Sequence, residues 1–559
     1  MIHFGGDYNP DQWPEQVWAE DLALMRQARV TLVTVGVFAW SRLQPAPDTF
    51  DFGWLDRVLD GLAASGIGVC LATPTASPPP WFTRFHPAEM PETASGVRLS
   101  HGSRDTYCVN APTYRAASIR IAGVLSARYA THPALRMWHV HNEYGTTCYC
   151  DHCAAAFRTW LGDRYGDVAA LNDAWSTDFW SQRYGDLAEV LPPRATQYLG
   201  NPAHLLDYRR FVSDAMLGHY RAQRAVLAGA PVTTNFVLGA WVPVDHARWA
   251  REVDVVAVDD YPTSISGHLA ARAFTADLAR GWAGGEPWLL MEHAPGAVGD
   301  QALPPGEATA AAETYLDRGA AGVMYFQWRA GRGGAEQWHP AMVPHEGPDT
   351  PVFAEMCAIG ERLAGREPTV PVCDVALIYD EETRWAWESA HQPARLDYDA
   401  TCRRWHAEQP GPIDVLPPGA GLDGYRLVLA PLLHLMAPGT HAALRDYVHR
   451  GGTLVLGYAS GLVDENCRVT PGALDDLIGA RIVRRGPLAG AVPLDDGGVG
   501  RVWFDELVPD GATVLVRAAD GRPAVTSHRF GAGEVRYLAT ELSVRASVAL
   551  RSPVPPEGF

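Results

Sequence analysis

Short apolar runs alternate with segments of helical periodicity through the first part of the chain. Eight of these runs predict strands, at 3–7, 32–37, 68–73, 134–142, 232–237, 253–258, 288–292 and 322–328. Between them, segments such as 15–28 and 114–129 repeat apolar residues on one face of a helix. Eight strand–helix units favour a closed (β/α)8 barrel over an open, doubly wound sheet.

The connection between the fourth and fifth predicted strands is longer than a helix crossover needs. It holds two helical patterns, at 154–165 and 168–175, and then a Pro-rich stretch at 190–202. Because long connections inside a compact domain are uncommon, we expect an inserted excursion on the rim of the barrel.

The pattern restarts beyond a Pro-containing boundary at 366–371. Short apolar strands are predicted at 375–379, 413–416, 427–431 and 453–457, with helical segments such as 441–450 between them. This pattern is typical of a smaller α/β domain with a parallel sheet. We therefore predict a barrel domain at 1–370, an α/β domain at 371–545 and a short C-terminal tail at 546–559.

Length and charge narrow the possible functions. A chain of 559 residues is too long for one core and predicts more than one domain. Its net charge of −18 argues against nucleic acid or an anionic membrane as a partner. The first residues read as a buried strand rather than a signal peptide, and no apolar run reaches the roughly 18–20 residues of a membrane span. We expect a cytoplasmic protein.

Two glutamates stand out in this pattern. Glu143 and Glu292 each follow or end an apolar run, and turn-like sequence comes after each. Barrels of this class carry their active sites at the carboxyl ends of the strands. Two carboxylates facing one sugar are also the minimal machinery of glycoside hydrolysis. The alternative interpretation is a pair of salt-bridge partners at the barrel rim.

Three of the nine cysteines lie close together, as Cys148, Cys150 and Cys153. In a cytosolic protein such a cluster favours a metal site over disulfides. Zn²⁺ takes four ligands in a tetrahedron, so a fourth is needed, and Cys108 and His152 are both candidates. A site closed by four cysteines would be structural rather than catalytic. Reduced thiols without a metal are the alternative.

Many ordered motifs of the chain resemble those of the glycoside hydrolase family 42 β-galactosidases. They are Gly-Gly-Asp-Tyr-Asn-Pro-Asp-Gln-Trp-Pro (5–14), Phe-Ala-Trp-Ser (38–41), Phe-Gly-Trp-Leu-Asp (52–56), Ser-Pro-Pro-Pro-Trp (77–81), Gly-Ser-Arg with Tyr-Cys (102–108), Asn-Glu-Tyr-Gly (142–145), Phe-Gln-Trp-Arg (326–329) and Gly-Ala-Glu-Gln-Trp-His (334–339). The resemblance covers nearly the whole barrel and, more loosely, the second domain. It implies a retaining exo-glycosidase that acts on terminal β-D-galactosyl residues.

The resemblance also implies roles for individual residues. Glu143 matches the family's acid/base and Glu292 matches its nucleophile. Asn142 matches the residue that binds the sugar's 2-hydroxyl. The other positions that match sugar-binding residues are Arg104, Glu336 and His339.

The same resemblance implies a structural zinc ion and an assembly. Cys108, Cys148, Cys150 and Cys153 match the family's zinc cluster. The second domain resembles the family's flavodoxin-like trimerisation domain, which implies a homotrimer.

Two departures from the family pattern affect these expectations. After its nucleophile the family usually has an Asn-Trp pair, whereas Asp300 stands here where the tryptophan would be, so we expect Asp300 to alter sugar recognition. The family's usual C-terminal β-sandwich is expected to be absent or vestigial. Two rival functions follow, namely a glycosidase acting on another sugar such as an α-L-arabinopyranoside, and a non-catalytic sugar-binding protein.

Overall fold

The computed structural model describes residues 1–239, 241–262, 268–296, 304–389 and 392–543. The chain divides into two compact units. The first comprises Met1–Asn172, Thr177–Gln197 and Tyr208–Pro371, and the second comprises Asp173–Ser176, Tyr198–Asp207 and Val372–Phe559. Asp300 and the predicted tail at 546–559 lie outside the described residues.

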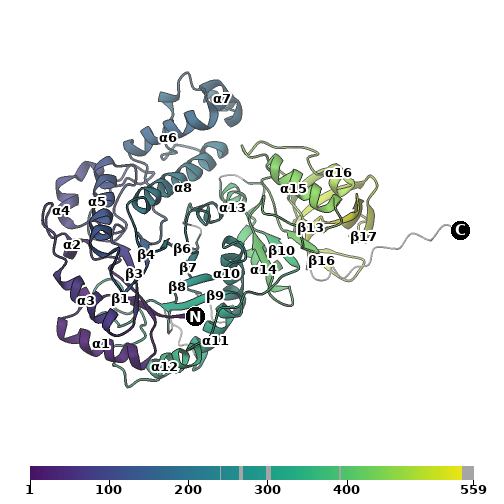
Figure 1. The fold of residues 1–559 in the computed structure, drawn as a ribbon. Coiled ribbons are helices and arrows are strands. Elements are labelled where there is room, and N and C mark those ends of the chain that lie inside the picture. The colour runs from purple at the N-terminus through teal and green to yellow at the C-terminus, as the bar shows by residue number, and fades with distance from the viewer. Residues whose placement is uncertain (240, 263–267, 297–303, 390–391, 544–559) are drawn as a thin grey trace. The chain divides into compact units, whose positions relative to one another are not determined.

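Parallel strands form the centre of the first unit (Figure 1). They are β1 (His3–Tyr8), β2 (Leu32–Val35), β3 (Gly68–Thr73), β4 (Leu135–Val140), β5 (Val232–Thr233), β6 (Asn235–Val237), β7 (Ala257–Asp259), β8 (Trp288–Glu292) and β9 (Ala320–Tyr325). Their order is β5-β4-β3-β2-β1-β9-β8-β7-β6. Only Thr234 separates β5 from β6, so these two short strands are halves of one barrel strand, and the sheet closes as the predicted (β/α)8 barrel.

The sixth barrel strand lies further along the chain than its apolar pattern predicts. The predicted strand was 253–258, whereas β7 spans Ala257–Asp259. Asp254 explains the difference, because its backbone N–H donates to Val232 and its carboxylate accepts from the Val232 N–H at 2.8 Å. These bonds tie the residues before β7 to β5 as a connecting segment.

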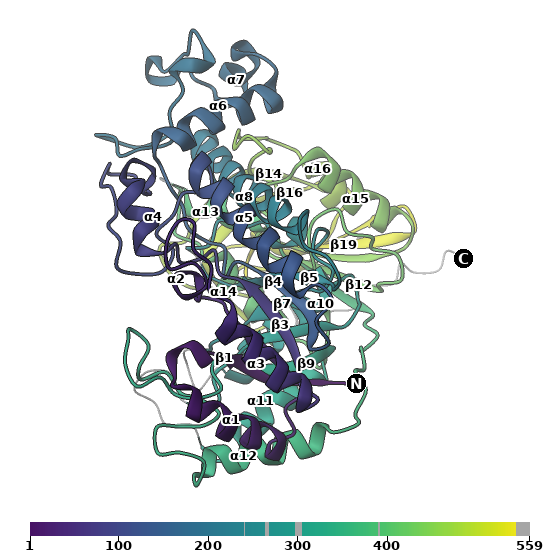
Figure 2. The same ribbon diagram turned by 60° about the vertical axis from the view of Figure 1, so that its left-hand side comes forward.

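Helices surround the barrel, as Figure 2 shows. They include α1 (Glu15–Gln27), α3 (Gly53–Ala64), α5 (Pro112–Tyr129), α8 (Pro202–Arg224), α10 (His268–Trp282), α11 (Glu307–Leu316) and α12 (Pro351–Leu363). Side chains from several strands fill the barrel interior, and these are Leu32, Cys70, Met137, Ala257, Leu289, Met291 and Met324. The barrel is therefore a packed core, and its chemistry must lie at its ends.

The long connection after β4 contains the expected helices. These are α6 (Asp151–Tyr165), α7 (Val168–Trp175), η3 (Phe179–Ser181) and η4 (Leu187–Glu189), followed by α8. Phe157 of α6 packs against Tyr208 and Phe211 of α8, with ring centroids 5.0 and 5.2 Å apart. The excursion is thus a packed helical layer.

The second unit contains a seven-stranded sheet of order β11-β10-β12-β13-β19-β18-β17. The strands are β10 (Val375–Ile378), β11 (Asp414–Leu416), β12 (Leu427–Ala430), β13 (Thr453–Gly457), β17 (Thr513–Arg517), β18 (Pro523–Phe530) and β19 (Gly533–Leu538). β10, β11, β12, β13 and β19 run parallel, and β18 runs antiparallel to both of its neighbours, β19 and β17. The helices are α13 (Glu381–Glu388), α14 (Tyr398–Ala407), α15 (Pro438–His449) and α16 (Asp475–Ile478). A smaller antiparallel sheet consists of β14 (Ala480–Pro487), β15 (Val492–Pro493), β16 (Val499–Pro509) and β20 (Thr540–Glu541).

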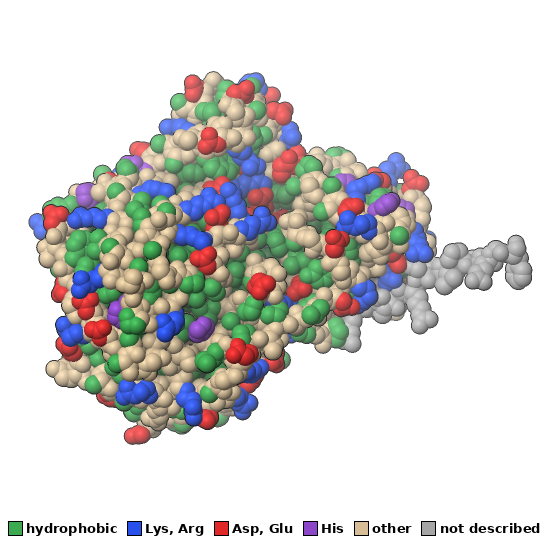
Figure 3. Space-filling view, in the orientation of Figure 1, with side chains coloured by type: hydrophobic (Ala, Val, Ile, Leu, Met, Phe, Trp, Pro, Cys, Tyr) green, Lys and Arg blue, Asp and Glu red, His purple; other side chains and the backbone are tan. Residues whose placement is uncertain are grey.

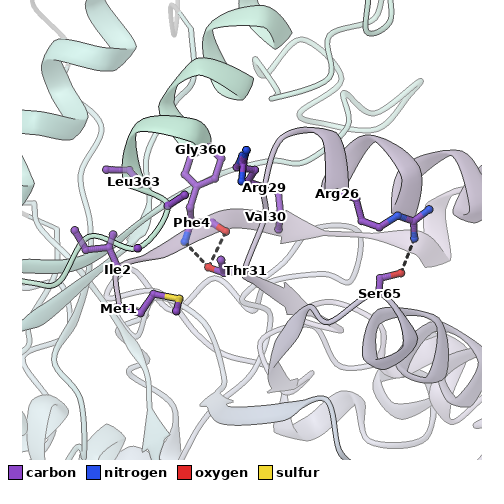
Figure 4. A pocket seen from close by; sticks show the side chains of 12 residues that line it. Met1, Ile2, Phe4, Arg26, Arg29, Val30, Thr31, Ser65, Gly360 and Leu363 are labelled. Carbon is purple, nitrogen blue, oxygen red and sulfur yellow. Dashed lines mark hydrogen bonds between the residues drawn. The ribbon is translucent and has the colours of Figure 1, made fainter.

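A cavity of about 310 Å³ lies at the amino end of the barrel strands. Its lining includes Ile2 and Phe4 (Figure 4). Its polar groups bond to one another, since the Phe4 N–H donates to Thr31 Oγ1 and Arg26 donates to Ser65, both at 2.9 Å. Barrel enzymes place their active sites at the opposite, carboxyl end, so this cavity is not the candidate site.

The surface carries both signs of charge. On the face in Figure 3, acidic and basic side chains are interspersed rather than gathered by sign. None of the helices in the described part of the chain is long and apolar enough to cross a membrane.

Candidate active site

The two glutamates that the sequence singled out meet at the carboxyl end of the barrel. Glu292 is the last residue of β8, and Glu143 lies three residues beyond the end of β4. A carboxylate oxygen of Glu143, one of Asp259 and one of Glu292 all lie within 4.8 Å of one another. Retaining glycosidases hold their two carboxyl groups about 5–5.5 Å apart and inverting ones about 6.5–9.5 Å apart, so this spacing fits the retaining class.

Asn235 connects both glutamates and is almost fully buried. Its side-chain oxygen accepts from the Glu143 backbone N–H at 2.7 Å. Its side-chain nitrogen lies 3.2 Å from Glu292 Oε1 and 2.6 Å from Asp259 Oδ2. Glu143 has a positive φ of 42°, which is unfavourable for a non-glycine residue and needs support from its surroundings. Asn235 therefore fixes the Glu143 backbone and, through the same amide, faces the Glu292 carboxylate.

The predicted residues Arg104 and Asn142 both contact Glu143. Arg104 Nη2 donates to Glu143 Oε2, and its Nε donates to Asp105 at 2.9 Å. The Asn142 side chain donates to Glu143 Oε2 at 3.3 Å and accepts from Asn235 at 3.0 Å. These two donors hold the Glu143 carboxylate toward the centre of the site.

Tyr261 and His339 lie on the other side of the cluster. Tyr261 Oη donates to Glu292 Oε2 at 2.7 Å. The His339 ring meets Tyr261 edge-on with centroids 5.6 Å apart, and it meets Phe326 in the same way at 4.8 Å. Burial lowers the pKa of His339, so its imidazole is neutral at pH 7. The structure thus places His339 against Tyr261, which in turn donates to Glu292.

The remaining predicted sugar-binding residues are placed differently. Glu336 is exposed, and its charge helps to raise the pKa of both Asp7 and Asp105, whose main cause is burial. It is therefore at the mouth of the site, within electrostatic reach. Asp300 falls outside the described residues, and its predicted effect on sugar recognition stays a prediction.

Two further carboxyl groups are buried beside the pair. Burial raises the pKa of Asp7 to about 8, and the nearby charges of Glu143 and Glu336 add to the shift. Burial, followed by the charges of Glu292 and Glu143, raises the pKa of Asp259 well above its ordinary value. Among the described residues, Oδ1 of Asp7 and Oδ1 of Asp259 have no hydrogen-bond partner. Asp7 is therefore mostly protonated at pH 7, and burial favours the protonated form of Asp259 as well.

The protons on Asp7 and Asp259 affect Glu292 directly. Burial raises the pKa of Glu292, with the charges of Asp7 and Glu143 adding to it, while the Tyr261 hydroxyl and Arg104 act in the opposite direction. A protonated Asp7 no longer repels an ionised Glu292. Since Glu292 also has hydrogen-bond donors at both oxygens, it is the buried carboxyl group best placed to carry the negative charge.

The sequence analysis did not identify Asn235, Tyr261, Asp7 or Asp259. Each lies within or just after a barrel strand, like the two glutamates. These residues could have been found by taking every polar residue at the carboxyl end of a predicted strand as a site candidate. Asp7 already lies inside the motif at 5–14. Asn235 lies inside the predicted strand at 232–237, so an apolar pattern does not single it out.

The four predicted cysteine ligands form a second cluster, away from the carboxylates. One sulfur each from Cys108, Cys148, Cys150 and Cys153 lies within 4.8 Å of the others, and all four are buried. Cys108 Sγ lies 3.6 Å from Cys150 Sγ and 3.5 Å from Cys153 Sγ. Of the two candidates for a fourth ligand, the structure thus brings Cys108 to the cluster rather than His152.

The raised pKa of Asp7 predicts a pH-dependent stability. Between its ordinary pKa of 3.8 and about 8, the folded protein keeps a proton on Asp7 that the unfolded chain releases. Stability from this group is therefore present at low pH and is lost as the pH rises through about 8. Asparagine cannot ionise, so the melting temperature of Asp7→Asn, relative to wild type, should rise between about pH 5 and about pH 8.

The exposed Asp163 provides the matched control for this prediction. Asp163→Asn should keep a constant difference from wild type over the same pH range. A constant difference for Asp7→Asn as well would contradict a neutral Asp7.

Comparison with known proteins identifies the family. The glycoside hydrolase family 42 model, described as "Beta-galactosidase", matches residues 7–365, and the "Beta-galactosidase trimerisation domain" model matches residues 373–553. A β-galactosidase of Arthrobacter sp is 41% identical over 96% of this chain and 82% of its own length. β-Galactosidase LacZ of Heyndrickxia coagulans is 38% identical over 97% and 86%.

Solved structures agree with the sequence relatives. The β-galactosidase from Bacillus circulans sp. alkalophilus has a TM-score of 0.92 and 34% identity, over 96% of this chain and 86% of that one. The β-galactosidase from the haloarchaeon Halorubrum lacusprofundi has a TM-score of 0.93 and 32% identity, over 98% and 88%. The chain belongs to the glycoside hydrolase family 42 β-galactosidases.

Proposed function

We propose that this protein is a retaining exo-glycosidase that removes terminal, non-reducing β-D-galactosyl residues. The observation that carries the proposal is the pair Glu143 and Glu292, whose carboxylates approach within 4.8 Å at the ends of two barrel strands. Each of the two stands at a position that matches the family's catalytic motifs. The named activity of the relatives supplies the sugar, and the carboxylate spacing supports retention.

In the first step Glu292 acts as the nucleophile. One of its oxygens bonds to the anomeric carbon while the bond from that carbon to the glycosidic oxygen breaks. Glu143 gives its proton to the departing oxygen, so the leaving group departs as a neutral alcohol. The product of this step is a galactosyl ester on Glu292.

In the second step the roles reverse. Glu143, now a carboxylate, takes a proton from water as the water oxygen attacks the anomeric carbon, and the ester bond to Glu292 breaks. Two inversions give net retention, Glu143 is protonated again, and Glu292 returns as a carboxylate.

The donors around the pair suit this sequence. Glu292 needs one free direction for attack, while its other oxygen can keep a hydrogen bond throughout the ester's lifetime. Tyr261 and Asn235 approach different oxygens of Glu292, so one donor remains whichever oxygen attacks. Arg104 and Asn142, both on Glu143, are also placed to turn toward sugar hydroxyls next to the breaking bond.

We also propose that a structural zinc ion is bound by Cys108, Cys148, Cys150 and Cys153. Zinc–sulfur bonds of about 2.3 Å in a tetrahedron place the sulfurs about 3.8 Å apart. The measured separations of 3.5, 3.6 and 3.9 Å fit this arrangement. In addition, the Glu92 N–H and the Asn110 side chain each donate to a cluster sulfur at 3.4 Å, as expected for thiolates. Zinc would supply folding stability and take no part in the reaction.

We further propose a cytoplasmic homotrimer. The match of residues 373–553 to the family's trimerisation domain supports self-association through the second unit. A cluster of reduced cysteines supports a reducing compartment.

The assignment of the two glutamates can be tested by substitution. Glu292→Ala should abolish turnover of all glycosides, and azide should restore it by forming the inverted galactosyl azide, because azide fills the space of the lost carboxylate. Glu143→Ala should keep more activity on substrates with good leaving groups, which need no proton. Rates and product stereochemistry on nitrophenyl galactosides are the measurement, and exchanged behaviour of the two variants would reverse the assignment. A nitrophenyl glycoside panel that includes α-L-arabinopyranoside tests the sugar.

The position of Asn235 predicts a large effect without contact to the scissile bond. Asn235→Ala removes the acceptor for the Glu143 N–H and the donor to Glu292. We expect kcat to fall by about 100-fold with a smaller change in KM, since catalytic groups displaced by about 1 Å lose roughly this factor. Asn466→Ala, which removes an amide of the second unit, is the control. A loss in kcat below about threefold would show that Asn235 positions neither glutamate.

The zinc proposal predicts about one equivalent of metal per chain in elemental analysis. Cys150→Ala should lose that metal and melt at a lower temperature, whereas Cys402→Ala, a buried cysteine of the second unit, should keep it. Full metal content in Cys150→Ala would refute the site.

The assembly proposal predicts a mass of three chains in multi-angle light scattering at micromolar concentration. The same measurement on residues 1–371 should give a smaller assembly. A monomeric full-length protein would contradict the trimer.

A further inference from the structure

An exposed tryptophan lies beside the candidate acid/base. Trp241, in the segment between β6 and α9 (His246–Trp249), is 58% exposed. Large aromatic side chains are usually buried, so one that remains accessible at the functional end of a barrel needs a reason. Neither the proposed nucleophile nor the donors around it use this ring.

The indole of Trp241 packs directly against two glycines. A Cβ added at Gly145 would lie 2.3 Å from Cζ3, on the six-membered ring. A Cβ added at Gly239 would lie 2.7 Å from Nε1, on the five-membered ring. Neither glycine is among the residues with positive φ, so the backbone conformation does not require glycine at either position. A side chain at either position would collide with the indole, so both glycines leave room for it. The six-membered ring lies against Gly145, and the five-membered ring lies against Gly239.

The contacts with Gly145 and Gly239 place Trp241 near Glu143, because both glycines lie on segments that hold Glu143. Gly145 is two residues after Glu143, and Gly239 follows β6, which begins at Asn235. Asn235 in turn accepts the Glu143 N–H. The indole therefore rests on the segments that hold the candidate acid/base, at the carboxyl ends of the fourth and fifth barrel strands.

The chemistry of Glu143 indicates what meets this ring. A general acid must approach the glycosidic oxygen, so the group beyond that oxygen passes close to it. Arg104, Tyr261 and His339 come from loops after other strands, and Asn142, which matches the residue for the sugar's 2-hydroxyl, precedes Glu143, whereas Gly145 and the indole against it follow Glu143. A ring beside Glu143, on the loop after the fifth strand, is on the leaving-group side.

We infer that Trp241 is the platform of an aglycone subsite, where it contacts the apolar C–H face of a leaving pyranose. The inference rests on the proposed function and specifies the substrate class, namely galactosides whose leaving group is itself a sugar. An indole offers the largest flat apolar face among side chains, and sugar C–H groups pack on such faces.

The test compares substrates that share galactose and differ in the leaving group. Lactose and its linkage isomers have a sugar as the leaving group, whereas β-galactosyl fluoride has a single atom. For Trp241→Ala, kcat/KM on the disaccharide that the wild type cleaves fastest should fall about threefold to tenfold, the size of one aromatic contact. On the fluoride it should be unchanged. Trp241→Phe, with a smaller aromatic face, should recover part of the loss.

The packing of Trp241 against Gly239 allows a second test with a variant that keeps the indole. Gly239→Ala places a methyl group against Nε1 and should shift the ring, which lowers kcat/KM on the same disaccharide but not on the fluoride. Equal losses on both substrates would show that Trp241 is structural, and no loss on either would show that the leaving sugar does not touch it. Both results overturn the inference. A wild-type enzyme that cleaves neither substrate would instead refute the proposed function.

Discussion

The active site depends on holding several carboxyl groups together without letting all of them ionise. Glu143, Asp259 and Glu292 approach within 4.8 Å, and Asp7 is close enough to raise the pKa of Glu292. Two like charges 4 Å apart repel by about 4 kcal/mol at an effective dielectric constant of about 20, so the cluster cannot carry all its charges. Burial favours the protonated forms of Asp7 and Asp259, and hydrogen-bond donors at both of its oxygens favour Glu292 as the anion.

Asn235 makes this arrangement possible because an amide can accept and donate at once. Its oxygen receives the Glu143 N–H, and its nitrogen faces Asp259 and Glu292. An aspartate here would add another charge, and an apolar residue would leave polar groups without partners. β5 pairs with β4 and β6 pairs with β7, so the two halves of the fifth barrel strand fix Asn235 between the strands that carry Glu143 and Asp259.

The sequence was sufficient to predict the barrel and the placement of both glutamates. Strands buried on both sides read as continuous apolar runs, and the residue that ends such a run must lie at the carboxyl rim. β3 and β8 begin and end at the predicted residues. The periodicity did not predict the bounds of β7 correctly. The apolar residues that precede β7 resemble a strand, but the hydrogen bonds of Asp254 to Val232 hold them as a connecting segment.

The groups that contact the two glutamates or shift the pKa of Glu292 could not be predicted from the apolar pattern either. Asn235 and Tyr261 act through contacts with residues 57 and 31 positions away in the chain, so only the closed barrel reveals them. Asp7 and Asp259 are ordinary acids in the sequence, and only their burial next to other carboxyl groups raises their pKa values.

Gly145 is a further residue whose role cannot be predicted from the sequence. As part of a motif it could be a turn residue, but its φ does not need glycine. Its missing Cβ matters because the indole of Trp241, 96 residues later, lies against it, two residues after Glu143. In this barrel the two candidate catalytic glutamates are visible in the sequence at strand ends, whereas the groups that shift the pKa of Glu292 and the contact of Trp241 are visible only in the packing.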